Sequence, residues 1–139
     1  MSTAQTDVLA LSPPATPNWH VAAPDGVRED IAGSRSPLYP LTVAALRTSF
    51  RNIVLAQPRI SCLYQAQAER EADIYEQRSP VFGFKDVIQV WSLQQNEQPQ
   101  LSGLVIYSRA LTGYYDFGVN RRRVRRWLRD LSRSLERTE

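Results

Sequence analysis

The chain has 139 residues, of which 42% are hydrophobic, and a formal net charge of +3 at pH 7. This length and apolar content predict one domain with one hydrophobic core. A single cysteine, Cys62, and a single histidine, His20, exclude an intramolecular disulfide and a Cys/His metal cluster, so we expect no bound metal and no cofactor.

Residues 1–36 are predicted to form an extended, partly disordered arm. Six of the nine prolines lie in residues 1–40, where apolar periodicity is weak. The beginning of the chain lacks the basic region of a secretory signal, and no stretch approaches the roughly 18 apolar residues of a membrane span. We therefore expect a soluble, cytoplasmic protein. Trp19 is expected to dock on the domain or on a partner, since a tryptophan ring is costly to leave in water.

The domain is predicted to span residues 37–139 and to begin with a helix. Thr42 can cap this helix, because apolar residues recur at helical spacing from Val43 to Val54 and the pattern stops before Pro58. Runs rich in β-branched and aromatic residues follow, separated by polar turns. These runs predict four strands at residues 59–67, 72–79, 86–93 and 101–110.

The last predicted element is a helix that begins after Asn120, a residue type that caps helix N-termini well. One apolar stripe runs along it, formed by Val124, Trp127, Leu128, Leu131 and Leu135. Residues 121–139 hold eight arginines against three acidic residues, so the positive excess of the chain lies here. Arginines in the first turn oppose the helix dipole, which indicates that the basic face has a use.

These elements predict an α+β fold in chain order helix, four-stranded antiparallel meander sheet, C-terminal helix, with an extended N-terminal arm. Both helices are expected on one face of the sheet.

The segment just before the last helix, residues 113–118, is predicted to form a fixed corner. Its two glycines permit positive φ, and its aspartate can accept amide hydrogen bonds or an arginine pair. The expected partners of Asp116 are the first amides of the helix, or Arg109, Arg121 or Arg123. A second, compatible interpretation is an anion site at the helix start, flanked by Arg109, Arg121, Arg122, Tyr114 and Tyr115.

Sequence motifs of known enzyme chemistries do not occur in the chain. It has no G-x-S-x-G, no glycine-rich phosphate loop, no H-E-x-x-H and no Cys–His pair. We therefore expect a protein that is not an enzyme and assign no catalytic residue, although acid–base chemistry needs only two well-placed groups. Nucleic-acid binding by the arginine-rich helix is an alternative that the modest net charge and the lack of stacking aromatics on the strands disfavour.

Two segments of the chain carry a recognisable pattern. Residues 78–86 read R-S-P-V-F-G-F-K-D, and Ser108-Arg109 is followed by Gly113, Asp116, Gly118, Asn120, Arg121 and Arg123. These segments resemble the bacterial and plastid family called domain of unknown function 1499, over about residues 38–131. The chain departs from the family pattern by two extra residues before Gly113, by Tyr115 in place of serine, and by Trp19 where a cysteine is common.

The resemblance implies a small α+β fold and implies no reaction. It draws attention to a set of motif residues: Arg78, Asp86, Gly113, Gly118 and Arg123.

The function that these observations favour is a non-enzymatic binding or assembly module whose arginine-rich C-terminal helix contacts an acidic protein surface or an anionic group. The candidate contact residues are Arg109, Tyr114, Asp116, Asn120, Arg121, Arg122, Arg125, Arg126 and Arg129. The alternative is a small-ligand or catalytic pocket formed where four residues meet: Arg78, Asp86, Arg109 and Asp116. Nucleic-acid binding by the same helix remains a second alternative.

Overall fold

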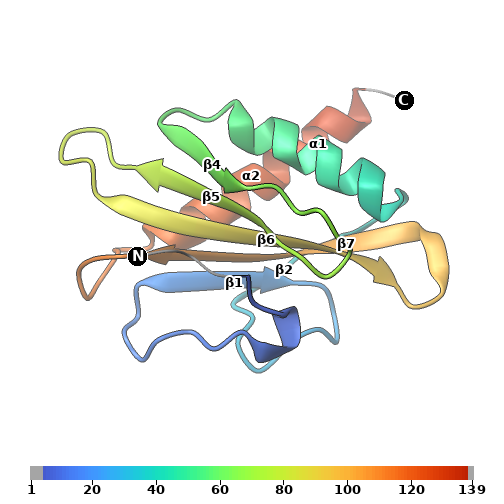
Figure 1. The fold of residues 1–139 in the computed structure, drawn as a ribbon, viewed down its shortest axis with the longest axis horizontal. Coiled ribbons are helices and arrows are strands. Elements are labelled where there is room, and N and C mark those ends of the chain that lie inside the picture. Colours follow the sequence, from blue (N-terminus) through green and yellow to red (C-terminus); the bar gives the residue numbers. More distant parts are fainter. Residues whose placement is uncertain (1–4, 138–139) are drawn as a thin grey trace.

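The computed structural model describes residues 5–137 as an α+β fold built on one mixed sheet (Figure 1). The strands are β1 (Trp19–Ala23), β2 (Ser34–Arg35), β3 (Leu38–Tyr39), β4 (Ile60–Tyr64), β5 (Asp73–Arg78), β6 (Lys85–Gln95) and β7 (Gln98–Ala110). The helices are α1 (Val43–Leu55) and α2 (Val119–Glu136), and a short 3-10 turn spans Val8–Ala10. The strand order is β2-β1-β7-β6-β5-β4, and β3 also pairs with β7.

The predicted meander is present, but it is only part of the sheet. β4, β5, β6 and β7 pair antiparallel in chain order, as expected. The sheet nevertheless has seven strands, and it is mixed, because β1 and β2 run parallel. The prediction of a four-stranded antiparallel sheet is therefore wrong in strand number and in topology.

The missed strands come from the proline-rich segment and from the short stretch that follows it. β1 pairs antiparallel with β7, with Trp19 opposite Arg109 and Ala22 opposite Ile106. Its last four residues are buried, so residues 19–23 are extended, as predicted, but they belong to the sheet and not to a partly disordered arm. This strand is difficult to predict from the sequence. It is only five residues long, prolines flank it, and its partner strand lies far along the chain.

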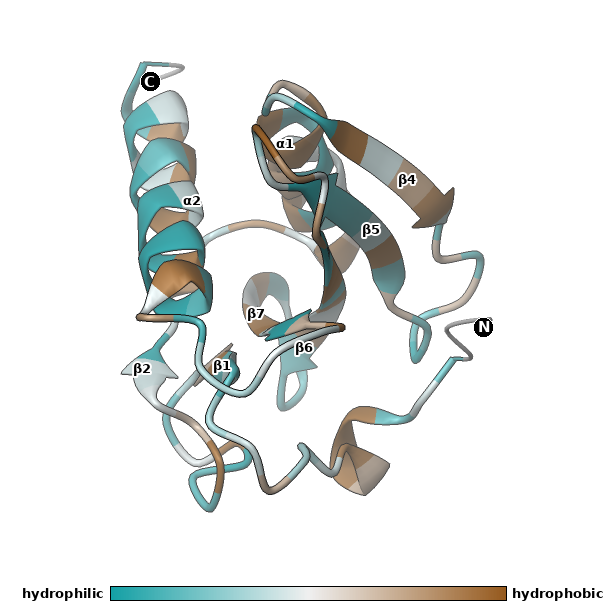
Figure 2. Cartoon of the chain, turned by 90° about the vertical axis from the view of Figure 1, so that its left-hand side faces the viewer, coloured by the Kyte–Doolittle hydropathy of each residue, from teal (hydrophilic) through white to brown (hydrophobic). Residues whose placement is uncertain are grey.

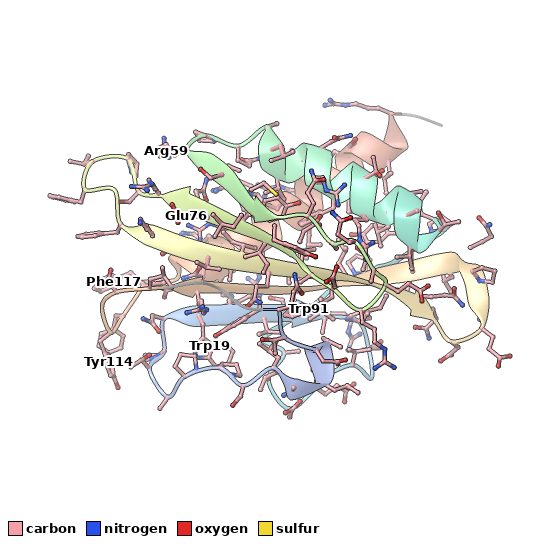
Figure 3. The ribbon with its side chains drawn as sticks, in the orientation of Figure 1. Trp19, Arg59, Glu76, Trp91, Tyr114 and Phe117 are labelled. Atoms are coloured by element: carbon pink, nitrogen blue, oxygen red, sulfur yellow. The ribbon has the colours of Figure 1, made fainter. Side chains whose placement is uncertain are left out.

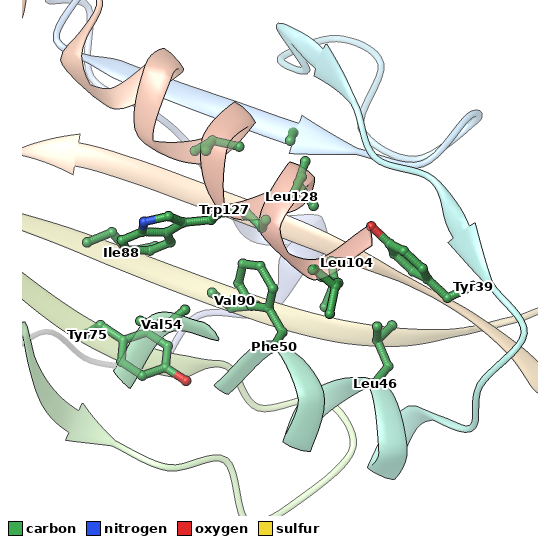
Figure 4. Packing of buried hydrophobic residues seen from close by; sticks show 14 residues of the cluster. Tyr39, Leu46, Phe50, Val54, Tyr75, Ile88, Val90, Leu104, Trp127 and Leu128 are labelled. Atoms are coloured by element: carbon green, nitrogen blue, oxygen red, sulfur yellow. The ribbon is translucent and has the colours of Figure 1, made fainter. Parts of the chain in front are cut away.

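Both helices cover one face of the sheet. Their predicted apolar stripes pack against that face and form the main core (Figure 4). Thr42 caps α1 as expected, since its hydroxyl accepts a hydrogen bond from the Ala45 amide at 3.1 Å. The rings of Phe50 on α1 and Trp127 on α2 meet edge to face, with their centroids 6.4 Å apart. The core stripe of α2 is buried as predicted, at Val124, Trp127, Leu128 and Leu131.

The opposite face of the sheet is covered by the N-terminal segment. Leu11 is buried against a cluster that includes Ile74 and Trp91. The indole Nε1 of Trp91 donates to the Thr6 carbonyl at 3.0 Å, and the Gln5 side chain exchanges two hydrogen bonds with the Ala72 backbone. The described part of this segment therefore closes a second core.

No helix within residues 5–137 is long and apolar enough to cross a membrane. Within the same residues, no group of three or more His, Cys, Asp and Glu side chains could hold a metal ion.

Replacing Leu11 with alanine tests whether the N-terminal segment contributes to stability. We expect Leu11→Ala to lower the free energy of unfolding by about 2–5 kcal/mol, because it empties a buried site. Leu9→Ala is the matched control: Leu9 is 75% exposed, and its loss should change little. Urea unfolding curves measure both, and equal stabilities for the two variants would contradict the packing of this segment.

His20 on β1 is buried beneath the start of α2. Its Nε2 lies 2.7 Å from the Ser34 hydroxyl, and Gly33 leaves room for the ring, since a Cβ there would lie 2.8 Å from the His20 Cε1. Burial, reinforced by the charges of Arg121 and Arg125 and opposed by Asp116, lowers the pKa of His20 to about 4.

This shift predicts an acid-sensitive fold. The lowered pKa means that the folded state holds His20 neutral, so its stabilising contribution is present above pH 6.5 and is lost as the pH falls toward 4. The loss should reach at most about 3 kcal/mol. His20→Gln should flatten the pH dependence of unfolding in this window, as measured by thermal melts at several pH values. An NMR titration that gives His20 an ordinary pKa would disprove the assignment.

Candidate functional site

The side chain of Arg123 lies at the centre of the end of the sheet where α2 begins. It is 6% exposed, although it is an arginine in the first turns of a surface helix. Its Nε donates to Gln77 on β5 at 2.6 Å, and its Nη2 donates to Asp86 on β6 at 2.7 Å. Its Nη1 donates to Ser108 on β7 and to Asn120 on α2. One guanidinium thus joins three strands to the helix.

A carboxylate and an amide side chain fix the corner before α2. Asp116 accepts hydrogen bonds from the Gly118 amide at 3.0 Å and from both the backbone and the side chain of Asn120. Asn120 Nδ2 also reaches the Asn18 carbonyl, and the Asn18 side chain donates to the Gly113 carbonyl at 2.8 Å. The corner is therefore tied to the residue just before β1.

Two predictions about this corner need correction. Asn120 is not the N-cap of α2: it is fully buried inside the first turn, and the N-cap is Gly118, with a left-handed φ of 78°. The predicted ion pair of Asp116 with Arg109, Arg121 or Arg123 is also wrong, because its oxygens bind Gly118 and Asn120. The alternative prediction, that Asp116 accepts from the first amides of the helix, is confirmed.

These hydrogen bonds determine the charge state of Asp116. Desolvation opposes its ionisation, but the bonds from Asn120 and Gly118 outweigh this and hold the pKa of Asp116 below its ordinary value. The carboxylate is therefore ionised at neutral pH and is already used within the corner.

The remaining predicted arginines divide into two places. Five of them are exposed on α2: Arg121, Arg122, Arg125, Arg126 and Arg129. Arg122 also donates to the Phe117 carbonyl at 2.9 Å, across the start of the helix. Arg109 instead lies beside Tyr107, with its guanidinium carbon 5.9 Å from the ring centroid, on the face that the helices do not cover.

A groove of about 350 Å³ opens between the β5–β6 loop and the corner before α2. Three of the four residues of the predicted pocket line it, namely Arg78, Asp86 and Asp116, together with Arg123. Arg109 does not line it. The two motif segments, separated by more than 20 residues of sequence, thus form the two walls of one concave surface.

The groove combines paired carboxylates with exposed cations. Burial raises the pKa of Asp86, while the Arg123 guanidinium, 2.7 Å away, opposes that shift. Arg59, Arg78 and Arg126 line the groove and are exposed at its rim. Of these, Arg78 also forms an ion pair with Glu76 at 3.2 Å. The rim can therefore present positive charge to an incoming group.

Aromatic side chains flank this groove. Tyr114 and Tyr115 were expected near the helix start, whereas Phe82, Phe84 and Phe117 were not assigned to a surface from the sequence. Phe82 and Phe84 stack on the β5–β6 loop with centroids 5.5 Å apart. Tyr115 contacts Tyr114 and Phe117 on the β7–α2 loop, at 4.7 Å and 6.3 Å between centroids. Both loops lie at the same end of the sheet, where Tyr114 and Phe117 mark the edge of the molecule (Figure 3). The sequence signal that could have predicted this surface is the position of these aromatic residues beside the glycines of the two loops.

The fold and the site define a small α+β protein whose two motif segments meet in one groove beside a helix start. Residues 12–131 match the family described as "Protein of unknown function (DUF1499)", and the chain belongs to this family. No curated protein and no solved structure matches the chain.

Replacing Arg123 tests the central network. We expect Arg123→Gln to lower the free energy of unfolding by about 3–5 kcal/mol, because it leaves Asp86 buried without its partner. The loss should shrink at acidic pH, where Asp86 becomes neutral, and in the double variant with Asp86→Asn. Arg122→Gln, on the exposed side of the same turn, is the control and should retain most of the stability. A double-mutant cycle that shows no coupling between Arg123 and Asp86 would refute the role of the pair.

Proposed function

We propose that the protein is a non-enzymatic binding module that holds an anionic group of its partner in the groove between the β5–β6 loop and the start of α2. The observation that carries this proposal is the state of the charges there. The two carboxylates that line the groove, Asp86 and Asp116, are engaged by Arg123 and by the helix start. The arginines at the rim remain exposed to solvent.

The chemistry of the rim favours a carboxylate or phosphate as the bound group. Arg59, Arg78 and Arg126 come from different elements and line the same space of about 350 Å³. Guanidinium groups bind carboxylate and phosphate oxygens in pairs of parallel hydrogen bonds, and they are weakly hydrated. A cationic group would instead meet three like charges at the entrance.

The exposed face of α2 extends the same positive surface away from the groove. Arg122, Arg126 and Arg129 follow one another at spacings of four and three residues, so they lie on one side of the helix. Because Trp127 and Leu131 face the sheet, these arginines face solvent. If a partner places one acidic group in the groove, the acidic groups next to it on the partner would face this row of arginines.

A binding role accounts for the carboxylates better than acid–base catalysis does. A general base must hold its carboxylate free to take a proton from substrate. Asp86 instead receives the Arg123 Nη2 at 2.7 Å, and Asp116 receives both donors of Asn120. Their oxygens are placed to shape the groove.

Pyrophosphate, a small polyanion, tests the groove directly. We expect it to shift the amide resonances of Ser79 and Val119 in a saturable way, and to bind less tightly as salt rises. Arg78→Gln with Arg126→Gln should weaken binding about tenfold or more, since each charge-assisted hydrogen bond is worth about 1.5–3 kcal/mol.

The matched control removes two charges at the far end of the sheet, with Arg47→Gln and Arg70→Gln. It should bind pyrophosphate as the wild type does. Unsaturable shifts in the wild type, or equal weakening by the control variant, would show that the groove is not an anion site.

A further inference from the structure

The two loops beside the groove expose an unusual amount of aromatic surface. Phe82 is 77% exposed and Phe117 is 86% exposed, and Val81, Phe84 and Tyr115 are exposed next to them. Both loops project from one end of the sheet, and Figure 2 views the molecule from this end. Exposed apolar side chains that gather in this way mark an interaction surface.

The backbone holds these side chains outward. Ser79 and Phe84 exchange two backbone and side-chain hydrogen bonds of 2.9 Å, which close the β5–β6 loop around Gly83. Phe117 has a φ of 53°, a left-handed conformation that is unfavourable for a bulky residue. The Arg122 hydrogen bond to its carbonyl helps to hold it there. The corner thus keeps a strained phenylalanine in water.

Positive charge surrounds the aromatic tips. Arg78 and Lys85 flank the β5–β6 loop, and Arg121, Arg122 and Arg126 are exposed beside the β7–α2 loop. The nearby acidic groups are engaged: Glu76 with Arg78, Asp86 with Arg123, and Asp116 with the helix start. This end therefore pairs apolar tips with exposed cations, one of which, Arg78, is ion-paired with Glu76.

We propose that this end of the protein docks on the surface of a lipid bilayer that contains anionic phospholipids. The aromatic tips enter the interfacial region, where phenyl and phenol rings are stable, and the arginines contact headgroup phosphates. The role of the groove, which receives one such phosphate, rests on the function proposed above. Each arginine or lysine near an anionic surface adds to the attraction, and this attraction weakens as salt rises.

The arrangement fits a bilayer better than an acidic protein. A protein partner would need a separate cavity for the tip of each loop, at a fixed distance across the groove. A bilayer needs only that tips and cations lie on the same side of the molecule, because its interface adapts to shape. The acidic protein becomes one outcome of the test.

Co-sedimentation with vesicles tests the proposal. We expect the full chain to bind vesicles of phosphatidylcholine that contain phosphatidylglycerol, to bind less at high salt, and not to bind pure phosphatidylcholine. Phe82→Ser with Phe117→Gly should weaken vesicle binding roughly a hundredfold or more, since the variant loses both rings that the interface would bury. The fold should persist, because glycine relieves the backbone strain at position 117; thermal melts check this.

The control variant, Leu9→Ser with Leu63→Ser, removes exposed leucines elsewhere and should bind vesicles normally. Pyrophosphate binding should survive the loop substitutions. Wild-type protein that binds pyrophosphate or polyglutamate but not the anionic vesicles would overturn lipid docking and leave the groove function standing. Vesicle binding that the loop variant retains would also overturn it. Vesicle binding that depends on the tips in a protein that ignores pyrophosphate would support docking and refute the groove function.

Discussion

The hydrogen bonds of one buried guanidinium, that of Arg123, determine how the rest of this end of the molecule is built. A buried cation is tolerated only when its donors are satisfied, and here Gln77, Asp86, Ser108 and Asn120 provide the acceptors. Those acceptors come from three neighbouring strands and from α2 itself. The start of α2 must therefore lie against the ends of β5, β6 and β7. The groove exists because this constraint brings the two motif segments to face each other.

Sequence periodicity predicted the elements that bury a regular apolar pattern. The stripe of Val124, Trp127 and Leu131 and the runs of β6 and β7 were readable because one face of each must be apolar. β1 was missed, since five residues between prolines carry too short a pattern and their partner strand lies more than 80 residues away. Asn120 misled for a different reason. Its side chain suits a helix cap and a buried network equally well, and only the position of Asn18 and Ser108 decides between them.

The candidate site was predictable residue by residue but not as a surface. The sequence motifs pointed to Arg78, Asp86 and Asp116, and these three residues do line the same groove. Strand alternation excludes Arg109 from the groove once the contact of its neighbour Ser108 is known. Side chains alternate across a strand, and Ser108 points to the helix face to meet Arg123. Its neighbour must then point to the opposite face, beside Tyr107. The aromatic tips could not be derived in this way, because exposure in a loop depends on hydrogen bonds such as those between Ser79 and Phe84.

Two departures from local stability rules lie together at the end of the fold where α2 begins. Arginines occupy the first turn of α2, where the helix dipole disfavours them. Phe117 adopts a left-handed backbone conformation although its side chain is exposed to solvent. The network explains only part of this: Arg123 is needed inside, and Arg122 holds the Phe117 carbonyl. Neither role requires an aromatic ring at position 117, and a glycine would fit its φ with less strain. Local conflicts that the fold itself does not need are expected where a sequence serves binding. The ring at 117 and the exposed arginines beside it therefore fit the contact surface proposed above.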